Sequence, residues 1–122
     1  MYVTSRKRAT GAGAAGRGTE AHWNMTVTSW ILALLTFPFL LVIAIGVGKP
    51  YVEAVAFYAS PLPALVAGGY ILVGMIHFAQ GFRTLVEDYV HGEARKLAII
   101  AGAFVAYAAA FAALWAILRL AL

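Results

Sequence analysis

One histidine lies deep within an apolar stretch of this sequence. His77 belongs to an uncharged run from Pro63 to Phe82, in which Gly74 precedes it by three residues and Gly81 follows it by four. An imidazole at the depth of a lipid bilayer needs a partner, because its polar nitrogens are costly to leave unsatisfied in hydrocarbon. His77 is therefore a candidate functional residue, and a bound metal cofactor is the leading candidate partner.

The spacing around His77 suits a flat cofactor. On a helix that advances about 100° per residue, one stripe contains Tyr70, Gly74, His77, Gly81, Thr84 and Asp88. The glycines remove side chains where a flat ring held by the imidazole would rest, so the economical explanation is an axial ligand of haem iron. The spacing leaves an alternative open, in which the histidine bonds to a Ser or Thr of a neighbouring helix and the glycines serve helix packing.

The composition places these residues in a membrane. Of the 122 residues, 63% are hydrophobic and 11% are charged, whereas the apolar share of soluble domains is nearer one half. A helix needs about 20 apolar residues to cross a bilayer, and the sequence predicts such spans at about 27–47, 62–86 and 97–120. The predicted fold class is an all-α integral membrane protein with three transmembrane helices and a short outer-surface helix near 51–58.

The chain outside these spans is short. Residues 1–22 form a basic, Gly/Ala-rich arm, which we expect to be extended and to become ordered on a protein or membrane surface. Residues 23–122 form the three-helix membrane anchor domain. The arm contains a G-x-G-x-x-G spacing over 11–16, which we interpret as accidental because no strand precedes it. No soluble catalytic domain fits in the remaining connectors.

Lys and Arg residues predict the orientation, because such residues in short flanks are held on the cytoplasmic side. One side of the predicted bundle has Arg6, Lys7, Arg8, Arg17, Arg83, Arg95 and Lys96, and the other has Lys49 and Arg119. The N-terminus and the turn at 83–96 are therefore predicted to be cytoplasmic. The net charge of +4 is a topology signal rather than a sign of nucleic-acid binding. Without cysteine, the chain supplies no disulfide, thiolate ligand or iron-sulfur cluster.

Asp88 and Tyr89 form a second candidate site at the predicted cytoplasmic end of the second span. A phenol there can donate a hydrogen bond to a quinone carbonyl, and a neighbouring carboxylate can orient it or relay protons. The alternative is that Tyr89 is an interfacial aromatic residue beside a solvated ionic turn. Residues alone favour that simpler interpretation.

These residues resemble a known family. The segments His77-Phe78-Ala79-Gln80-Gly81 and Glu87-Asp88-Tyr89-Val90-His91-Gly92 are similar to the hydrophobic membrane anchor of succinate dehydrogenase, respiratory complex II. The three-span layout agrees, and the N-terminal segment around His22 and Trp23 is similar to alphaproteobacterial members. The resemblance covers nearly the whole chain, although only 77–92 is specific.

The resemblance implies a function and a set of partners. His77 matches the axial ligand of haem b, Tyr89 matches a ubiquinone-contacting tyrosine, and Asp88 lies beside it. A second, cytochrome b-type anchor subunit would supply the other haem ligand, while an iron-sulfur subunit and a flavoprotein subunit would deliver electrons from succinate on the cytoplasmic face of a bacterial inner membrane. This chain would have no succinate site of its own.

One departure and three rival functions accompany this interpretation. Many relatives have an arginine where this sequence has Thr26, so a contact from that position to a haem propionate is in doubt. A fumarate reductase anchor would have the same features. A small proton-conducting or transport subunit would use His77 and Asp88 as a relay, and a purely structural assembly subunit would bind neither haem nor quinone.

Overall fold

The structure is a computed structural model that describes residues 2–11 and 18–122, and its described part is helical with connecting turns. Its elements in chain order are α1 (Ser5–Thr10), α2 (Gly18–Val47), α3 (Tyr51–Ala59), α4 (Pro61–Tyr89) and α5 (Glu93–Ala121). The three longest helices, α2, α4 and α5, are long and apolar enough to cross a membrane. The predicted three-span helical fold is therefore confirmed.

The N-terminal region differs from the extended arm that we expected. Residues 5–10 form α1, whose first turn is capped by the Thr4 side chain accepting a hydrogen bond from the Lys7 N–H at 3.2 Å. Helix α2 begins at Gly18 rather than near residue 27, because nothing from 18 to 26 breaks a helix. Apart from Gly11, the G-x-G-x-x-G spacing over 11–16 lies outside the described residues.

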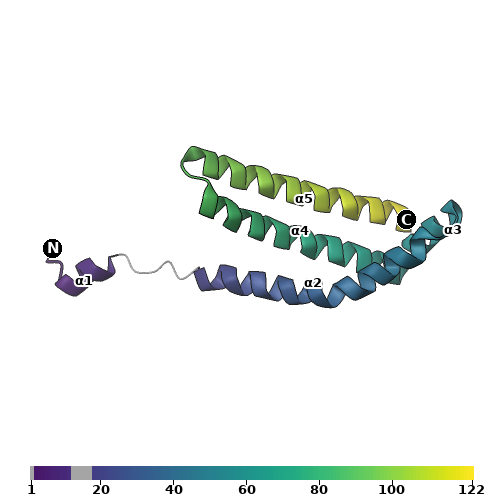
Figure 1. Cartoon of the computed structure of the whole chain (residues 1–122), viewed down its shortest axis with the longest axis horizontal. Helices are drawn as coiled ribbons and strands as arrows, with labels where there is room; N and C mark the ends of the chain where they lie inside the picture. The colour runs from purple at the N-terminus through teal and green to yellow at the C-terminus, as the bar shows by residue number, and fades with distance from the viewer. Residues whose placement is uncertain (1, 12–17) are drawn as a thin grey trace.

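Helix α4 is the central element of the transmembrane part. It packs against α2 on one side and α5 on the other, while α2 and α5 make no contact with each other within the described ranges. Figure 1 shows the three helices side by side in one row, with α2 curving along its length. Pro38 lies inside α2 and removes one backbone hydrogen bond, which accounts for this bending.

Helices α4 and α5 approach closely through small residues. Ala106 and Ala110 of α5 are among the few buried apolar residues, and a side chain at Gly102 would overlap the Phe82 ring of α4. Small residues let helix backbones approach where lipid supplies no hydrophobic drive. The connection between the two helices turns at Gly92, whose φ of 69° favours glycine.

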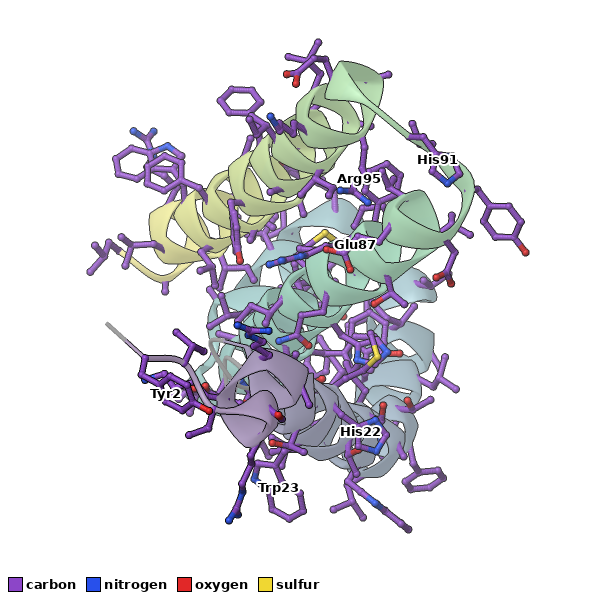
Figure 2. The ribbon with its side chains drawn as sticks, turned by 90° about the vertical axis from the view of Figure 1, so that its left-hand side faces the viewer. Tyr2, His22, Trp23, Glu87, His91 and Arg95 are labelled. Carbon is purple, nitrogen blue, oxygen red and sulfur yellow. The ribbon has the colours of Figure 1, made fainter. Side chains whose placement is uncertain are left out.

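Different helix ends and side chains gather at the two ends of the row. The start of α2, the end of α4 and the start of α5 share one end, where His22, Trp23, Glu87, His91 and Arg95 are found (Figure 2). Helix α3 and the C-terminus lie at the other end (Figure 1). The short helix predicted near 51–58 is confirmed as Tyr51–Ala59, and the two ends agree with the predicted grouping of the basic segments.

The orientation of the row in the membrane can be tested by labelling single cysteines, because the natural chain has none. We expect a membrane-impermeant maleimide to label Val52→Cys in intact spheroplasts, and His91→Cys only after permeabilisation. Both positions are exposed in the chain. The reverse pattern would show that the positive-inside prediction has the wrong sign here.

Candidate functional site

His77 bonds to a hydroxyl of the neighbouring helix. Its Nδ1 atom lies 2.8 Å from Oγ1 of Thr28, so a half-buried imidazole on α4 is tied to α2. The Thr28 hydroxyl also lies 3.0 Å from the backbone carbonyl oxygens of Asn24 and Met25. A fourth neighbour is Gln80, whose Oε1 is 3.4 Å from the same hydroxyl. The polar nitrogen Nδ1 is therefore satisfied within this chain.

The residue stripe predicted around His77 faces α2. Toward the end of the row that holds α3, the Tyr70 hydroxyl lies 3.4 Å from Thr36 Oγ1, and its ring stacks on Phe39 with centroids 4.1 Å apart. Toward the other end, Gly81 lies against Met25. Contacts thus run in antiparallel order along the α2–α4 interface, and the helical phase predicted from the sequence is confirmed for these residues.

The two glycines beside His77 are not required by packing within the chain. A Cβ at Gly74 would lie 3.8 Å from Leu32 Cδ2, and one at Gly81 would lie 3.8 Å from Met25 Cε. Both distances are ordinary van der Waals contacts, in contrast to the overlap that a Cβ at Gly102 would make. Packing of α2 on α4 would accept alanine at both sites, so it does not by itself explain the glycines.

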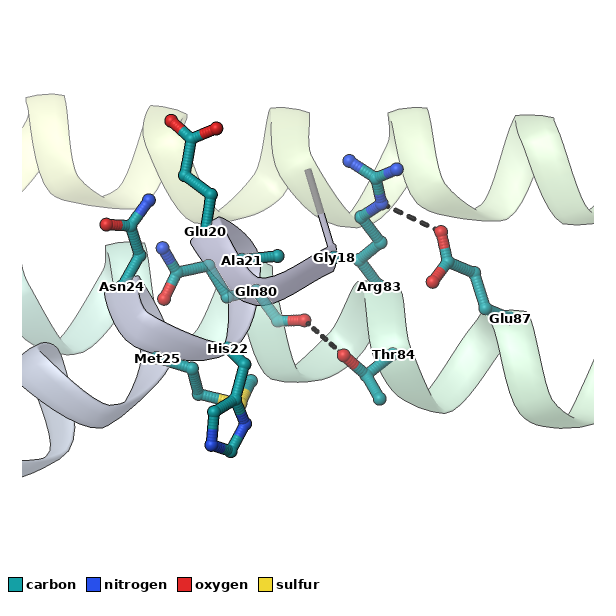
Figure 3. A pocket seen from close by; sticks show the side chains of 10 residues that line it. All are labelled: Gly18, Glu20, Ala21, His22, Asn24, Met25, Gln80, Arg83, Thr84 and Glu87. Carbon is teal, nitrogen blue, oxygen red and sulfur yellow. Dashed lines mark hydrogen bonds and ion pairs between the residues drawn. The ribbon is translucent and has the colours of Figure 1, made fainter. Parts of the chain in front are cut away.

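A cleft of about 760 Å³ opens between the start of α2 and the end of α4. Its lining, drawn in Figure 3, is Gly18, Glu20, Ala21, His22, Asn24, Met25, Gln80, Arg83, Thr84 and Glu87. Arg83 Nε donates to Glu87 Oε1 at 2.8 Å, which neutralises the cation locally. The cleft continues the His77 side of α4 by one to three turns, because Gln80, Thr84 and Glu87 follow His77 at helical spacing.

Asp88 and Tyr89 lie at the end of α4 and are not part of the cleft lining. Tyr89 is 77% exposed, and Asp88 is also exposed. At a rise of about 1.5 Å per residue, Tyr89 lies about 18 Å along α4 from His77. The structure therefore does not bring the predicted haem and quinone residues together. The side chains of Asp88 and Tyr89 are exposed on the surface of the chain.

The ionic turn that we considered as an alternative is present in part. Besides the Arg83–Glu87 pair, Lys96 Nζ lies 3.0 Å from Glu93 Oε1. Exposed ion pairs of this kind contribute little stability, typically below about 1 kcal/mol. Neither pair includes Asp88, whose carboxylate stays available for other contacts.

Comparison with known proteins is consistent with this architecture. The sequence family described as "Succinate dehydrogenase/Fumarate reductase transmembrane subunit" matches residues 2–116. The chain belongs to this family. It is also similar to the succinate dehydrogenase hydrophobic membrane anchor subunit of Paracoccus denitrificans, with 40% identity over 121 residues, which cover 99% of this chain and 94% of the relative. No solved structure matches the chain.

Membership of this family agrees with the exposed surfaces of the row. A transmembrane subunit of such an enzyme is a multi-pass membrane protein that assembles with other subunits, and the large apolar side chains here are mostly uncovered. Phe37 and Leu34 of α2 and Phe104 of α5, for example, are each more than 70% exposed. Lipid and other polypeptides can cover these faces.

Sequence reasoning missed two residues of the site. Thr28 was not singled out, and Gln80 was noted only as part of the family motif, yet both lie within hydrogen-bond range of each other beside His77. The sequence analysis did allow that the imidazole bonds to a Ser or Thr of a neighbouring helix. That alternative did not specify which hydroxyl of α2 would face His77.

The glycine contacts predict a contrast between two alanine variants of the assembled complex. Gly102→Ala should lower its melting temperature, because a methyl group would press into the Phe82 ring and overpacking costs about 1–3 kcal/mol. Gly69→Ala is the matched control, since a Cβ there meets nothing within 4 Å. Equal melting temperatures for the two variants would contradict the described α4–α5 contact.

Proposed function

We propose that this chain is the hydrophobic membrane anchor of a bacterial succinate:ubiquinone oxidoreductase, located in the cytoplasmic membrane. In this proposal His77 supplies one axial ligand to haem b, while Tyr89 and Asp88 form part of the ubiquinone site. Family membership supports the anchor role. The contact between His77 Nδ1 and Thr28 Oγ1 at 2.8 Å is the hydroxyl bond of the alternative interpretation, and it is compatible with the ligand role because it uses only one of the two ring nitrogens.

This contact leaves the other ring nitrogen suited to a metal. Histidine ligands commonly bind a metal through one nitrogen while the other donates its proton to a nearby oxygen. Within residues 2–11 and 18–122, no polar group hydrogen-bonds to His77 Nε2. A Cβ at Gly74 or Gly81 would only reach ordinary contact with Leu32 or Met25 of α2, so packing within the described residues does not demand glycine there. The donor chemistry of His77 fits a haem ligand, and a haem bound there would supply one-electron transfer.

The proposal requires a second polypeptide. The chain has two other histidines, of which His22 lines the cleft and His91 lies in the exposed turn. We therefore assign the second haem ligand to a cytochrome b-type anchor subunit. In this proposal an iron-sulfur subunit and a flavoprotein subunit complete the enzyme and carry out succinate oxidation.

The end of α4 suits a quinone contact. The Tyr89 hydroxyl can donate a hydrogen bond to a quinone carbonyl, and Asp88 can orient that hydroxyl or accept a proton. Both side chains are exposed in the isolated chain, which supports a site closed by another subunit. The family description also includes fumarate reductases, so rates of succinate oxidation and fumarate reduction by the assembled enzyme separate these two assignments.

Substitution of His77 tests the ligand role. In the purified complex, His77→Ala should abolish or shift the dithionite-reduced minus oxidised haem spectrum, because one iron ligand is lost, while the three helices still insert. His91→Ala is the matched control and should keep the native spectrum, since His91 lies in the exposed turn. A native low-spin spectrum in His77→Ala would rule out ligation by this residue.

Removal of the Tyr89 hydroxyl tests the quinone role. Tyr89→Phe should keep the haem spectrum and lose most ubiquinone reduction, because a phenyl ring cannot donate to the quinone carbonyl. Tyr51→Phe at the opposite end of the row is a matched control that should retain activity. Measurement of succinate:ubiquinone turnover decides the matter, and unchanged turnover in Tyr89→Phe would remove this residue from the site.

A further inference from the structure

We propose that Thr28 is a positioning residue for the haem ligand, and that its hydroxyl sets the tautomer and orientation of His77 and so lowers the reduction potential of the haem. This inference rests on the proposed function, because it presupposes that His77 binds iron. Thr28 lies on α2, and it acts through the 2.8 Å contact between its Oγ1 and His77 Nδ1.

The surroundings of the Thr28 hydroxyl favour one direction for this hydrogen bond. Three acceptor oxygens surround Oγ1: the carbonyls of Asn24 and Met25 at 3.0 Å, and Gln80 Oε1 at 3.4 Å. A threonine in a helix commonly donates to a carbonyl of the preceding turn. With its single proton directed to one of these oxygens, Oγ1 has a lone pair left for the imidazole.

With this direction, His77 Nδ1 carries the ring proton and donates a hydrogen bond to Thr28 Oγ1. The neutral imidazole then has its other lone pair on Nε2, the nitrogen that can bind iron. The opposite tautomer would place a proton on Nε2 and prevent coordination. Thr28 thus selects the ligating tautomer before any metal is bound, and it also fixes the rotation of the ring by a second point of attachment.

Other hydroxyl residues of α2 do not share this role. Within the described part of the chain, Thr26 bonds to the carbonyl of His22 at 2.9 Å and Ser29 to that of Met25 at 2.8 Å. Thr36 resembles Thr28 more closely, since it bonds to the Leu32 carbonyl and also reaches across to α4. Its partner on α4 is the Tyr70 hydroxyl at 3.4 Å instead of the histidine.

A hydrogen-bond acceptor at Nδ1 makes the imidazole a stronger electron donor. Greater donation stabilises the oxidised iron and lowers the reduction potential, which is one of the ways in which a protein tunes a haem. Loss of the Thr28 hydroxyl should therefore raise the potential. A serine should preserve it, because a serine hydroxyl can occupy the same place on the helix.

The test uses the purified complex with three variants: Thr28→Val, Thr28→Ser and Thr36→Val. Thr28→Val should raise the haem midpoint potential in a redox titration and change the low-temperature g-values, which report ligand orientation. Thr28→Ser should remain near the native values. Thr36→Val also removes an α2–α4 hydrogen bond, so its native potential would show that the shift is specific to the histidine. If Thr28→Val lowers haem content, Thr28→Ala replaces it and should show the same rise.

Two outcomes would overturn the inference about Thr28. One is a native potential and native g-values in both Thr28→Val and Thr28→Ala. The other is an equal shift in Thr36→Val, which would assign the effect to the helix interface in general. Failure of the proposed function has a different signature, because a native low-spin spectrum in His77→Ala would deny the ligand itself. If the Thr28 variants keep the native potential and g-values while His77→Ala loses the haem, the role of Thr28 is overturned and the ligand role of His77 stands.

Discussion

Polar groups within a hydrocarbon layer must find partners inside the protein, and this constraint organises the contact between α2 and α4. Backbone groups meet it by forming helices. Three side-chain hydrogen bonds meet it between these helices: Thr28 bonds with His77 and with Gln80, and Thr36 bonds with Tyr70. In the described residues no side-chain hydrogen bond joins α4 to α5, whose contact depends instead on small residues such as Gly102 and Ala106. His77 therefore lies at the α2–α4 interface, where polar side-chain contacts hold the two helices in register.

The row of helices explains why this interface is incomplete in a single chain. Because α2 and α5 do not touch within the described residues, α4 has neighbours on two sides and is open on its broad faces. A closed bundle would surround His77 with its own side chains, whereas a row leaves it only half-buried. An incomplete site of this kind agrees with a subunit that assembles with others, and in the proposed function the missing half includes the second ligand of the haem.

Much of this arrangement could be predicted from the sequence, and the remainder depends on helix packing. Span number and the stripe through Gly74, His77 and Gly81 follow from hydropathy and the helical repeat, which are local properties. Thr28 could not be identified in this way. Helix α2 has five hydroxyl residues, Thr19, Thr26, Thr28, Ser29 and Thr36, and the one that meets the imidazole depends on the relative register of two helices. The early start of α2 was missed because a Gly/Ala-rich composition was taken to mean extended chain.

The placement of both candidate sites on α4 has a mechanical consequence for the proposed function. His77 and Tyr89 are separated by twelve residues of one continuous helix, so their separation of about 18 Å is set by helix geometry rather than by a loop. Assembly with other subunits can close the space around each residue without changing the distance between them. In the proposed function, the ligand side of the site would therefore be preorganised in this chain, by α4 along its length and by Thr28 around the ring, and the partner subunit would supply the opposing surface.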